Sequence, residues 1–120
     1  RSRTNTPMQA LVLLNDVTFV EAARVLAEDV LVRPDNDAEA AIGEAFLRVV
    51  SRPIEKYELA MLLQLHTAEL ARFQADPSAA EKLLAVGEAK SQGTVPAAEQ
   101  AAMTIVCHAL LNLDEAIVTP

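Results

Sequence analysis

Residues 97–117, AAEQAAMTIVCHALLNLDEAI, form a long and mostly apolar segment near the end of the chain. Its apolar side chains recur at the three- and four-residue spacing of an α-helix and cover most of its circumference. A helix this apolar is buried by its neighbours, so we expect it to be a long, mostly buried C-terminal helix at the centre of the molecule. The main apolar stripe consists of Ala102, Ile105, Val106, Ala109, Leu110, Leu113 and Ile117, and Met103, Cys107 and Leu111 extend it.

A narrow polar edge interrupts this apolar surface. Its residues also recur at spacings of three and four, which predicts that one side of the helix faces water or another polar surface. The edge consists of Gln100, Thr104, His108, Asn112 and Glu115.

The composition of the 120-residue chain favours helices throughout. It is 52% hydrophobic but only 3% aromatic, with no Trp and 3 Gly. Helices packed through small and medium aliphatic side chains fit these values, whereas a β-sandwich needs β-branched and aromatic residues with frequent turn glycines. A chain of this length supports one hydrophobic core. We therefore predict a single all-α domain over residues 1–120, a compact array of five or six helices around residues 97–117.

The charge balance argues against two classes of partner. The chain carries 10 basic and 17 acidic residues, which gives a formal net charge of -7 at pH 7. An acidic surface repels phosphate backbones and anionic lipids, so we expect no nucleic-acid binding. No apolar run reaches the length of a spanning helix, and the N-terminus shows no signal-peptide pattern. These observations predict no membrane insertion.

Five further helices are predicted from apolar spacing and from residues that cap helix N-termini. Proline at the first helical position supports two of these starts. The capping residues are Thr6, Asp16, Asn36 or Asp37, and Asp76, and the prolines are Pro7 and Pro77. The predicted helices span residues 8–14, 17–32, 38–50, 55–74 and 78–86. The small, polar segment 88–95 is the predicted flexible loop.

Candidate catalytic residues are few. His66 lies on the apolar side of its helix, where it could be a buried ligand or base, or a core residue satisfied by one hydrogen bond. Cys107 and His108 match the end of the haem-attachment signature C-x-x-C-H, but Thr104 replaces the first cysteine, so we predict no cofactor or metal site in this fragment. Adjacent helical residues point about 100° apart, which disfavours a Cys–His nucleophile pair. No recognised enzyme motif is present, so the sequence does not predict catalysis by this fragment.

Two stretches resemble a known family. RSRTNTPMQALVLLNDVTFVEAARVLAE, residues 1–28, and LLNLDEAI, residues 110–117, resemble the C-terminal part of a planctomycete-type domain of unknown function. That family occurs in large secreted proteins that often carry a cytochrome-c-like module. The chain departs from the family pattern at Val17, where a proline is expected, and at Ala116, where an aromatic residue is frequent.

The resemblance implies a context for the chain. It predicts the C-terminal fragment of a larger bacterial protein that is exported to the periplasm or beyond, with any haem on a separate module. The leading hypothesis is a non-catalytic structural or interaction module, which packs against the rest of its own chain or a protein partner through the apolar faces of its first and last helices. The isolated fragment could then form a homo-oligomer.

The family motif also supplies candidate site residues. Asparagines and acids at these positions either form a functional site or cap helices and fix the last turn locally. The alternative hypothesis is that they contribute part of an active site in a redox or polysaccharide-processing enzyme. It requires the two ends of the motif to converge on one pocket. The candidate positions are Arg3, Asn5, Asn15, Asp16, Asn112, Asp114 and Glu115.

Overall fold

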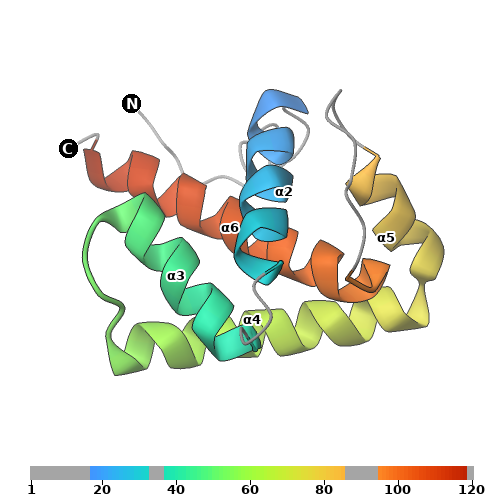
Figure 1. Cartoon of the computed structure of the whole chain (residues 1–120), viewed down its shortest axis with the longest axis horizontal. Coiled ribbons are helices and arrows are strands. Elements are labelled where there is room, and N and C mark those ends of the chain that lie inside the picture. The colour runs from blue at the N-terminus through green and yellow to red at the C-terminus, as the bar shows by residue number, and fades with distance from the viewer. Residues whose placement is uncertain (1–16, 33–36, 86–94, 119–120) are drawn as a thin grey trace.

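The computed structural model describes the backbone of residues 17–32, 37–85 and 95–118. It describes the side chains of residues 20–32, 37–85 and 95–112. These segments form an all-α fold, in which α6 runs through the middle and the other helices surround it (Figure 1). The helices are α2 (Val17–Leu31), α3 (Ala38–Val50), α4 (Lys56–Ala75), α5 (Pro77–Leu84) and α6 (Ala97–Val118). This confirms the predicted fold class.

The helix starts follow the capping rules. Asp37 has extended backbone angles and its carboxylate accepts a hydrogen bond from the Ala40 amide at 2.9 Å, so α3 begins as predicted. Asp76 accepts from the Ala79 amide at 3.3 Å and Pro77 occupies the first turn of α5. In both helices a short polar side chain satisfies an amide that the helix itself leaves without a partner.

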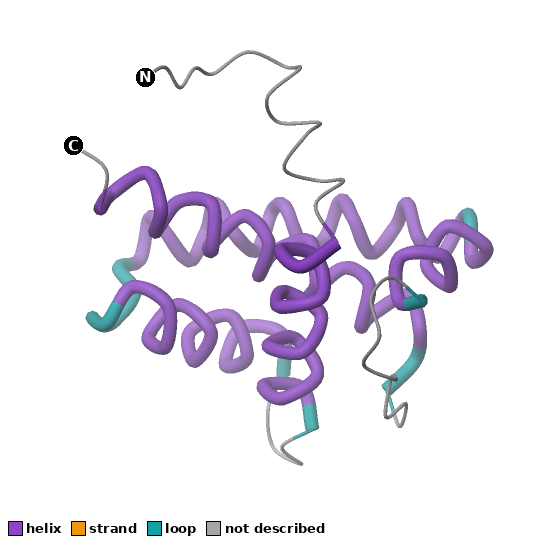
Figure 2. The backbone as a smooth tube through the Cα atoms, turned by 90° about the horizontal axis from the view of Figure 1, so that it is seen from above, coloured by secondary structure: helices purple, strands orange, loops and turns teal. Residues whose placement is uncertain are grey.

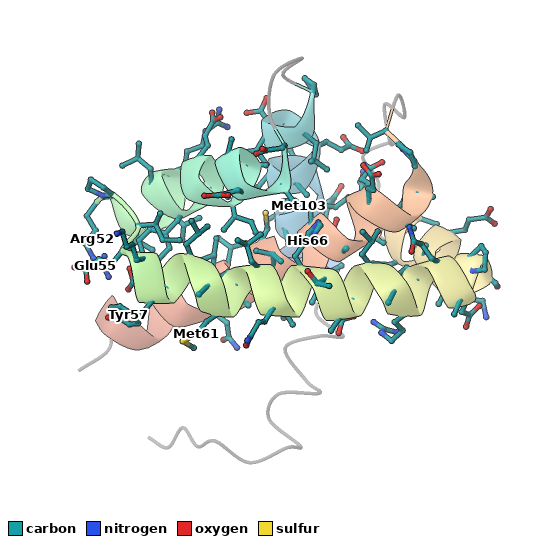
Figure 3. All side chains as sticks on the ribbon, turned by 90° about the horizontal axis from the view of Figure 1, so that it is seen from below. Arg52, Glu55, Tyr57, Met61, His66 and Met103 are labelled. Carbon is teal, nitrogen blue, oxygen red and sulfur yellow. The ribbon has the colours of Figure 1, made fainter. Side chains whose placement is uncertain are left out.

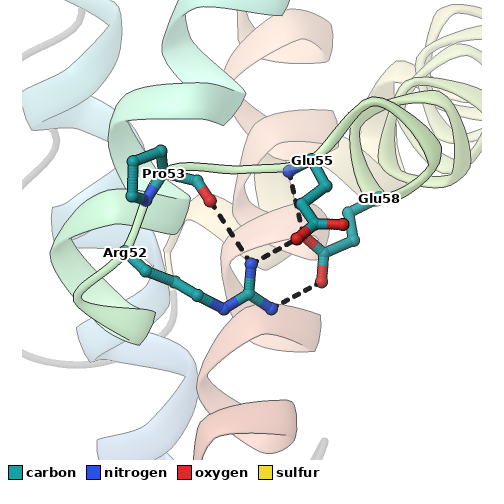
Figure 4. A network of polar contacts seen from close by, with 4 residues as sticks. All are labelled: Arg52, Pro53, Glu55 and Glu58. Atoms are coloured by element: carbon teal, nitrogen blue, oxygen red, sulfur yellow. Dashed lines mark hydrogen bonds and ion pairs between the residues drawn. The ribbon is translucent and has the colours of Figure 1, made fainter.

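The turn from α3 to α4 is held by backbone geometry and by a cluster of charges. Ser51 ends α3 in the left-handed region, at φ 68°, and its amide donates to the Leu47 carbonyl. The guanidinium of Arg52 then donates to both carboxylate oxygens of Glu58, at 3.0 and 2.7 Å (Figure 4). It also lies over the Phe46 ring, 4.9 Å from the ring centroid. Glu58 also accepts from the Glu55 amide at the start of α4. The donation from Arg52 lowers the pKa of Glu58.

The helix α6 is the hub of the core. Its most extensive contact is with α2, which crosses it in both views of the molecule (Figures 1 and 2), and it also packs on α3, α4 and α5. Apolar side chains from α2, α3 and α6 form the larger buried cluster, and leucines of α4 pack against it. A smaller cluster joins the end of α4 to α5 and the start of α6 through Phe73, Ala80, Ala101 and Ala102.

Several predictions lie outside the described residues. They concern the short first helix, the caps at Thr6 and Asp16, and most of the loop 88–95. The helix predicted for 78–86 ends at Leu84 in the structure. The last helix covers the predicted range and continues to Val118.

Ser51→Gly is expected to stabilise the fold. A left-handed conformation costs a residue with a Cβ about 1–2 kcal/mol, which glycine avoids while adding entropy to the unfolded chain. We expect a net gain of about 0.5–1 kcal/mol and a melting temperature higher by roughly 4 °C. Thermal unfolding followed by circular dichroism measures the change.

Ser78→Gly is the matched control, because Ser78 is exposed but lies in the first turn of α5. Here the same substitution should lower stability, by up to about 1 kcal/mol. Equal shifts of the two variants would contradict the role given to the backbone of Ser51.

Candidate functional site

Three polar residues, Arg24, Glu28 and Gln100, meet where α2 packs on α6. Arg24 of α2 is fully buried, with 0% of its surface exposed, and its Nη1 lies 3.2 Å from Oε2 of Glu28 one turn later. The same carboxylate oxygen accepts a hydrogen bond of 2.6 Å from Nε2 of Gln100 on α6. We call Arg24, Glu28, Gln100, Thr104 and His108 the polar seam. Among the described side chains of α2 and α6, it contains those that are polar or charged and buried, together with the partly buried Glu28.

The local sequence explains how a charged pair comes to be buried. Arg24 is four residues from Val20 and three from Ala27, so it projects from the apolar side of α2. Its neighbours Ala23 and Ala27 are buried as well, so this side of α2 belongs to the core. Burying charge is costly unless the geometry and the remaining hydrogen bonds compensate, and the bond from Gln100 supplies part of this compensation.

The structure differs from the expectation that the polar edge of the last helix faces water. That edge does not face water at Gln100, Thr104 and His108, since all three side chains are buried. The alternative that it faces another polar surface is correct at Gln100, which meets Glu28. Thr104 satisfies its hydroxyl within α6 by donating to the Gln100 carbonyl at 2.8 Å. The polar side chains of Gln100 and Thr104 can therefore be buried because each finds an acceptor.

His66 and Cys107 occupy core positions. His66 is buried on the inner side of α4, and burial lowers its pKa while the Glu99 carboxylate acts in the opposite direction. Burial raises the pKa of Cys107 to about 12. Its thiol therefore stays protonated at neutral pH, whereas a nucleophilic cysteine requires the thiolate. Both residues fit the core interpretation of the sequence.

The residues proposed from the family motif are mostly outside the described part of the chain. This applies to Arg3, Asn5, Asn15 and Asp16, and to the side chains of Asp114 and Glu115, whose backbone belongs to α6. Asn112 is half-buried near the end of the described side chains of α6. Convergence of these residues on one pocket stays a prediction.

The outer side of α4 carries a second feature that the sequence analysis missed. Tyr57 and Met61 are 63% and 64% exposed, and they project from the side of α4 opposite to His66 (Figure 3). At helical spacing their stripe continues through further exposed residues, and none of its members is charged. We call this stripe the outer α4 face; its members are Tyr57, Ala60, Met61, Gln64, Ala68, Ala71 and Ala75.

The sequence contained a signal for this face. Leu59, Leu62, Leu63 and Leu70 account for the inner side of α4, so the apolar residues at 57 and 61 have no place in the same core. A helix that is apolar on both sides is either buried all round or presents one side to another molecule. In this structure the outer side is exposed.

The described residues contain neither a metal-binding cluster nor a membrane-spanning helix. Among them no three His, Cys, Asp or Glu side chains are grouped as a metal ion would require. None of the described helices combines the length and the hydropathy needed to span a bilayer.

The chain matches a known protein family. Residues 1–66, just over half of the chain, match the family described as "PSD1: Protein of unknown function (DUF1553)". The match contains the whole of α2 and α3 and the first half of α4, and therefore Arg24, Glu28, Tyr57 and Met61. No curated protein and no solved structure matches the chain.

Glu28→Ala is expected to destabilise the fold strongly. It removes the carboxylate that Arg24 and Gln100 share and leaves their donors buried, at a cost of about 3 kcal/mol. Urea unfolding gives the difference in the free energy of unfolding.

Glu69→Ala is the matched control, because Glu69 pairs with Arg72 within one helix at 2.6 Å, but that arginine is half-exposed. Loss of this pair should cost less than about 1 kcal/mol. Similar losses for the two variants would contradict the structural importance of the seam.

Proposed function

The chain belongs to the PSD1 family of proteins of unknown function (DUF1553), and we propose that it is a non-catalytic interaction module. In this proposal the module docks an apolar helix of a protein partner on the outer α4 face. The core presents this face on a rigid helix, since α4 packs on α6 along its inner side. The chain's role is then to join two protein surfaces.

The exposure of Tyr57 and Met61 is the observation that carries the proposal. Large apolar side chains that gather on one exposed face, with no charge among them, are typical of protein contact sites. Tyrosine and methionine are both enriched in the cores of such contacts. Single exposed apolar residues elsewhere, such as Leu47 on α3, need no such explanation.

The chemistry of the seam supports a structural role. The Glu28 carboxylate is shared between Arg24 and Gln100, and the Thr104 hydroxyl is bonded within its own helix. A general acid or base has to reach a substrate, directly or through one water. Groups that are buried and bonded to each other serve better to fix two helices than to transfer protons.

The resemblance of residues 1–28 and 110–117 supports the wider context of the proposal. We infer that the protein containing this chain is exported and that any haem lies on a separate module. Cell fractionation and an absorption spectrum of the natural protein test both points. A cytoplasmic product would contradict the first point, and haem bound by residues 1–120 themselves would contradict the second, without affecting the role proposed for α4.

Removal of the apolar side chains from the outer α4 face should abolish most binding of a neutral hydrophobic dye. We expect the double variant Tyr57→Gln, Met61→Gln to lose at least about half of the Nile red fluorescence of the native chain. Measurement at about 1 µM protein keeps weak self-association from covering the face.

The double variant Val25→Gln, Val32→Gln is the matched control, because these residues are 45% and 56% exposed on or next to α2. It should keep the dye signal. Melting curves establish that both variants are folded. A signal that the α4 substitutions leave unchanged, or that the α2 substitutions reduce equally, would contradict the assignment of the docking surface to α4.

A further inference from the structure

We propose that the partner on the outer α4 face is a second copy of this chain, with the two α4 helices antiparallel about a two-fold axis. This inference rests on the proposed function and names the partner. Three properties of the outer α4 face support a second copy as the partner. The face lacks charge, its large and small side chains are unevenly distributed along the helix, and charged residues lie beside it.

Charge restricts where two copies of this chain can meet. Each copy has a formal net charge of -7, so most pairings of its surface bring carboxylates together. The outer α4 face avoids this repulsion over the whole length of a helix of 20 residues, because none of its members is charged. A copy of the same face is therefore an electrostatically acceptable partner.

Side-chain size favours the antiparallel orientation. Both large residues of the face, Tyr57 and Met61, lie in the first half of α4, and the second half presents only alanines. A two-fold contact places residue i against residue j and j against i. With the axis level with residue 66, each of the three longer side chains of the face meets an alanine: Tyr57 with Ala75, Met61 with Ala71, and Gln64 with Ala68.

A parallel pair would fit less well. It would place Tyr57 against Tyr57 and Met61 against Met61, while the alanines further along faced each other across a gap. Packing that leaves such a gap loses contacts, whereas alternating large and small residues fill it.

The charges beside the face agree with the antiparallel register. Arg72 and Glu58 lie on the same flank of α4 by their helical spacing. In the antiparallel pair, Arg72 of one copy lies at the height of residue 60 of the second copy. Glu58 of the second copy is two residues, or about half a helical turn, from that point. Arg72, which also pairs with Glu69 of its own helix, and Glu58, which also pairs with Arg52, are then neighbours at the rim of the contact on both sides of the two-fold axis.

The size of the face predicts a weak dimer. A helix of 20 residues is about 30 Å long and 10 Å wide, so one helix pair covers less than the roughly 800 Å² per partner of a stable complex. We expect a dissociation constant in the micromolar range, about 10–100 µM.

Sedimentation velocity of the full chain tests the proposal. Between about 5 and 500 µM the native chain should pass from monomer to dimer. Met61→Glu should raise the dissociation constant at least about tenfold, because each dimer would contain two carboxylates in apolar contact. Val32→Glu makes the same change at a similarly exposed position and should leave the dissociation constant unchanged.

A compensating substitution tests the register. In the double variant Met61→Glu, Ala71→Lys each introduced carboxylate faces an introduced ammonium of the other copy, so dimerisation should return to within about threefold of the native value. Met61→Glu, Ala75→Lys places the ammonium one turn away and should restore less. Melting curves establish that each variant is folded.

The outcomes separate this inference from the proposed function. A native chain that stays monomeric throughout, while its dye binding still depends on Tyr57 and Met61, overturns the second copy as partner and leaves the interaction module intact. If Met61→Glu does not weaken the dimer, the dimer contact does not lie on the outer α4 face. If the double variant Met61→Glu, Ala71→Lys does not recover dimerisation, the proposed register is wrong. Loss of the dependence of dye binding on α4 overturns the proposed function itself.

Discussion

The burial of one charged pair at the crossing of α2 and α6 is the constraint on which the structure depends. Arg24 and Glu28 form an ion pair on α2. The Glu28 carboxylate also accepts a hydrogen bond from Gln100 on α6, which is 72 residues from Glu28 in the sequence. A buried pair adds little net stability but becomes costly if one partner moves, so it specifies the relative position of the two helices. Apolar contacts are not directional, so they restrict the register of two helices less than a hydrogen-bonded pair does.

This crossing determines what the rest of the chain can do. With α2 on one side and α3, α4 and α5 on others, the described side chains of α6 between Gln100 and Leu110 are nearly all buried. The apolar face that we expected the last helix to offer a partner is therefore largely used within the chain. The exposed apolar face lies instead on α4, whose leucines face the core and whose tyrosine and methionine face outwards.

Residues close together in the sequence were sufficient to predict the helices. Which polar side chains are buried depends on contacts between residues far apart in the sequence. Asp37 and Asp76 were sufficient to locate two helix starts, because a cap acts on amides three residues away. The helical spacing of the leucines likewise predicted the inner side of α4. The burial of Gln100 could not be predicted from its sequence neighbours, because whether a polar strip faces water depends on the side chains that another helix places against it. Arg24 did carry a signal, as a charge at an apolar position of α2, but its partner on α6 is visible only in the folded chain.

Hydrogen exchange of the native chain tests most directly the claim that α6 is enclosed and held by the seam. The account predicts that amides of α6 from Thr104 to Leu110 exchange most slowly in the molecule, and only through global unfolding. Amides of α2 around Arg24 and Glu28 should show similar protection. Exchange of these α6 amides through local opening, as fast as that of the short helix α5, would contradict the central place given to α6 and to its contact with α2.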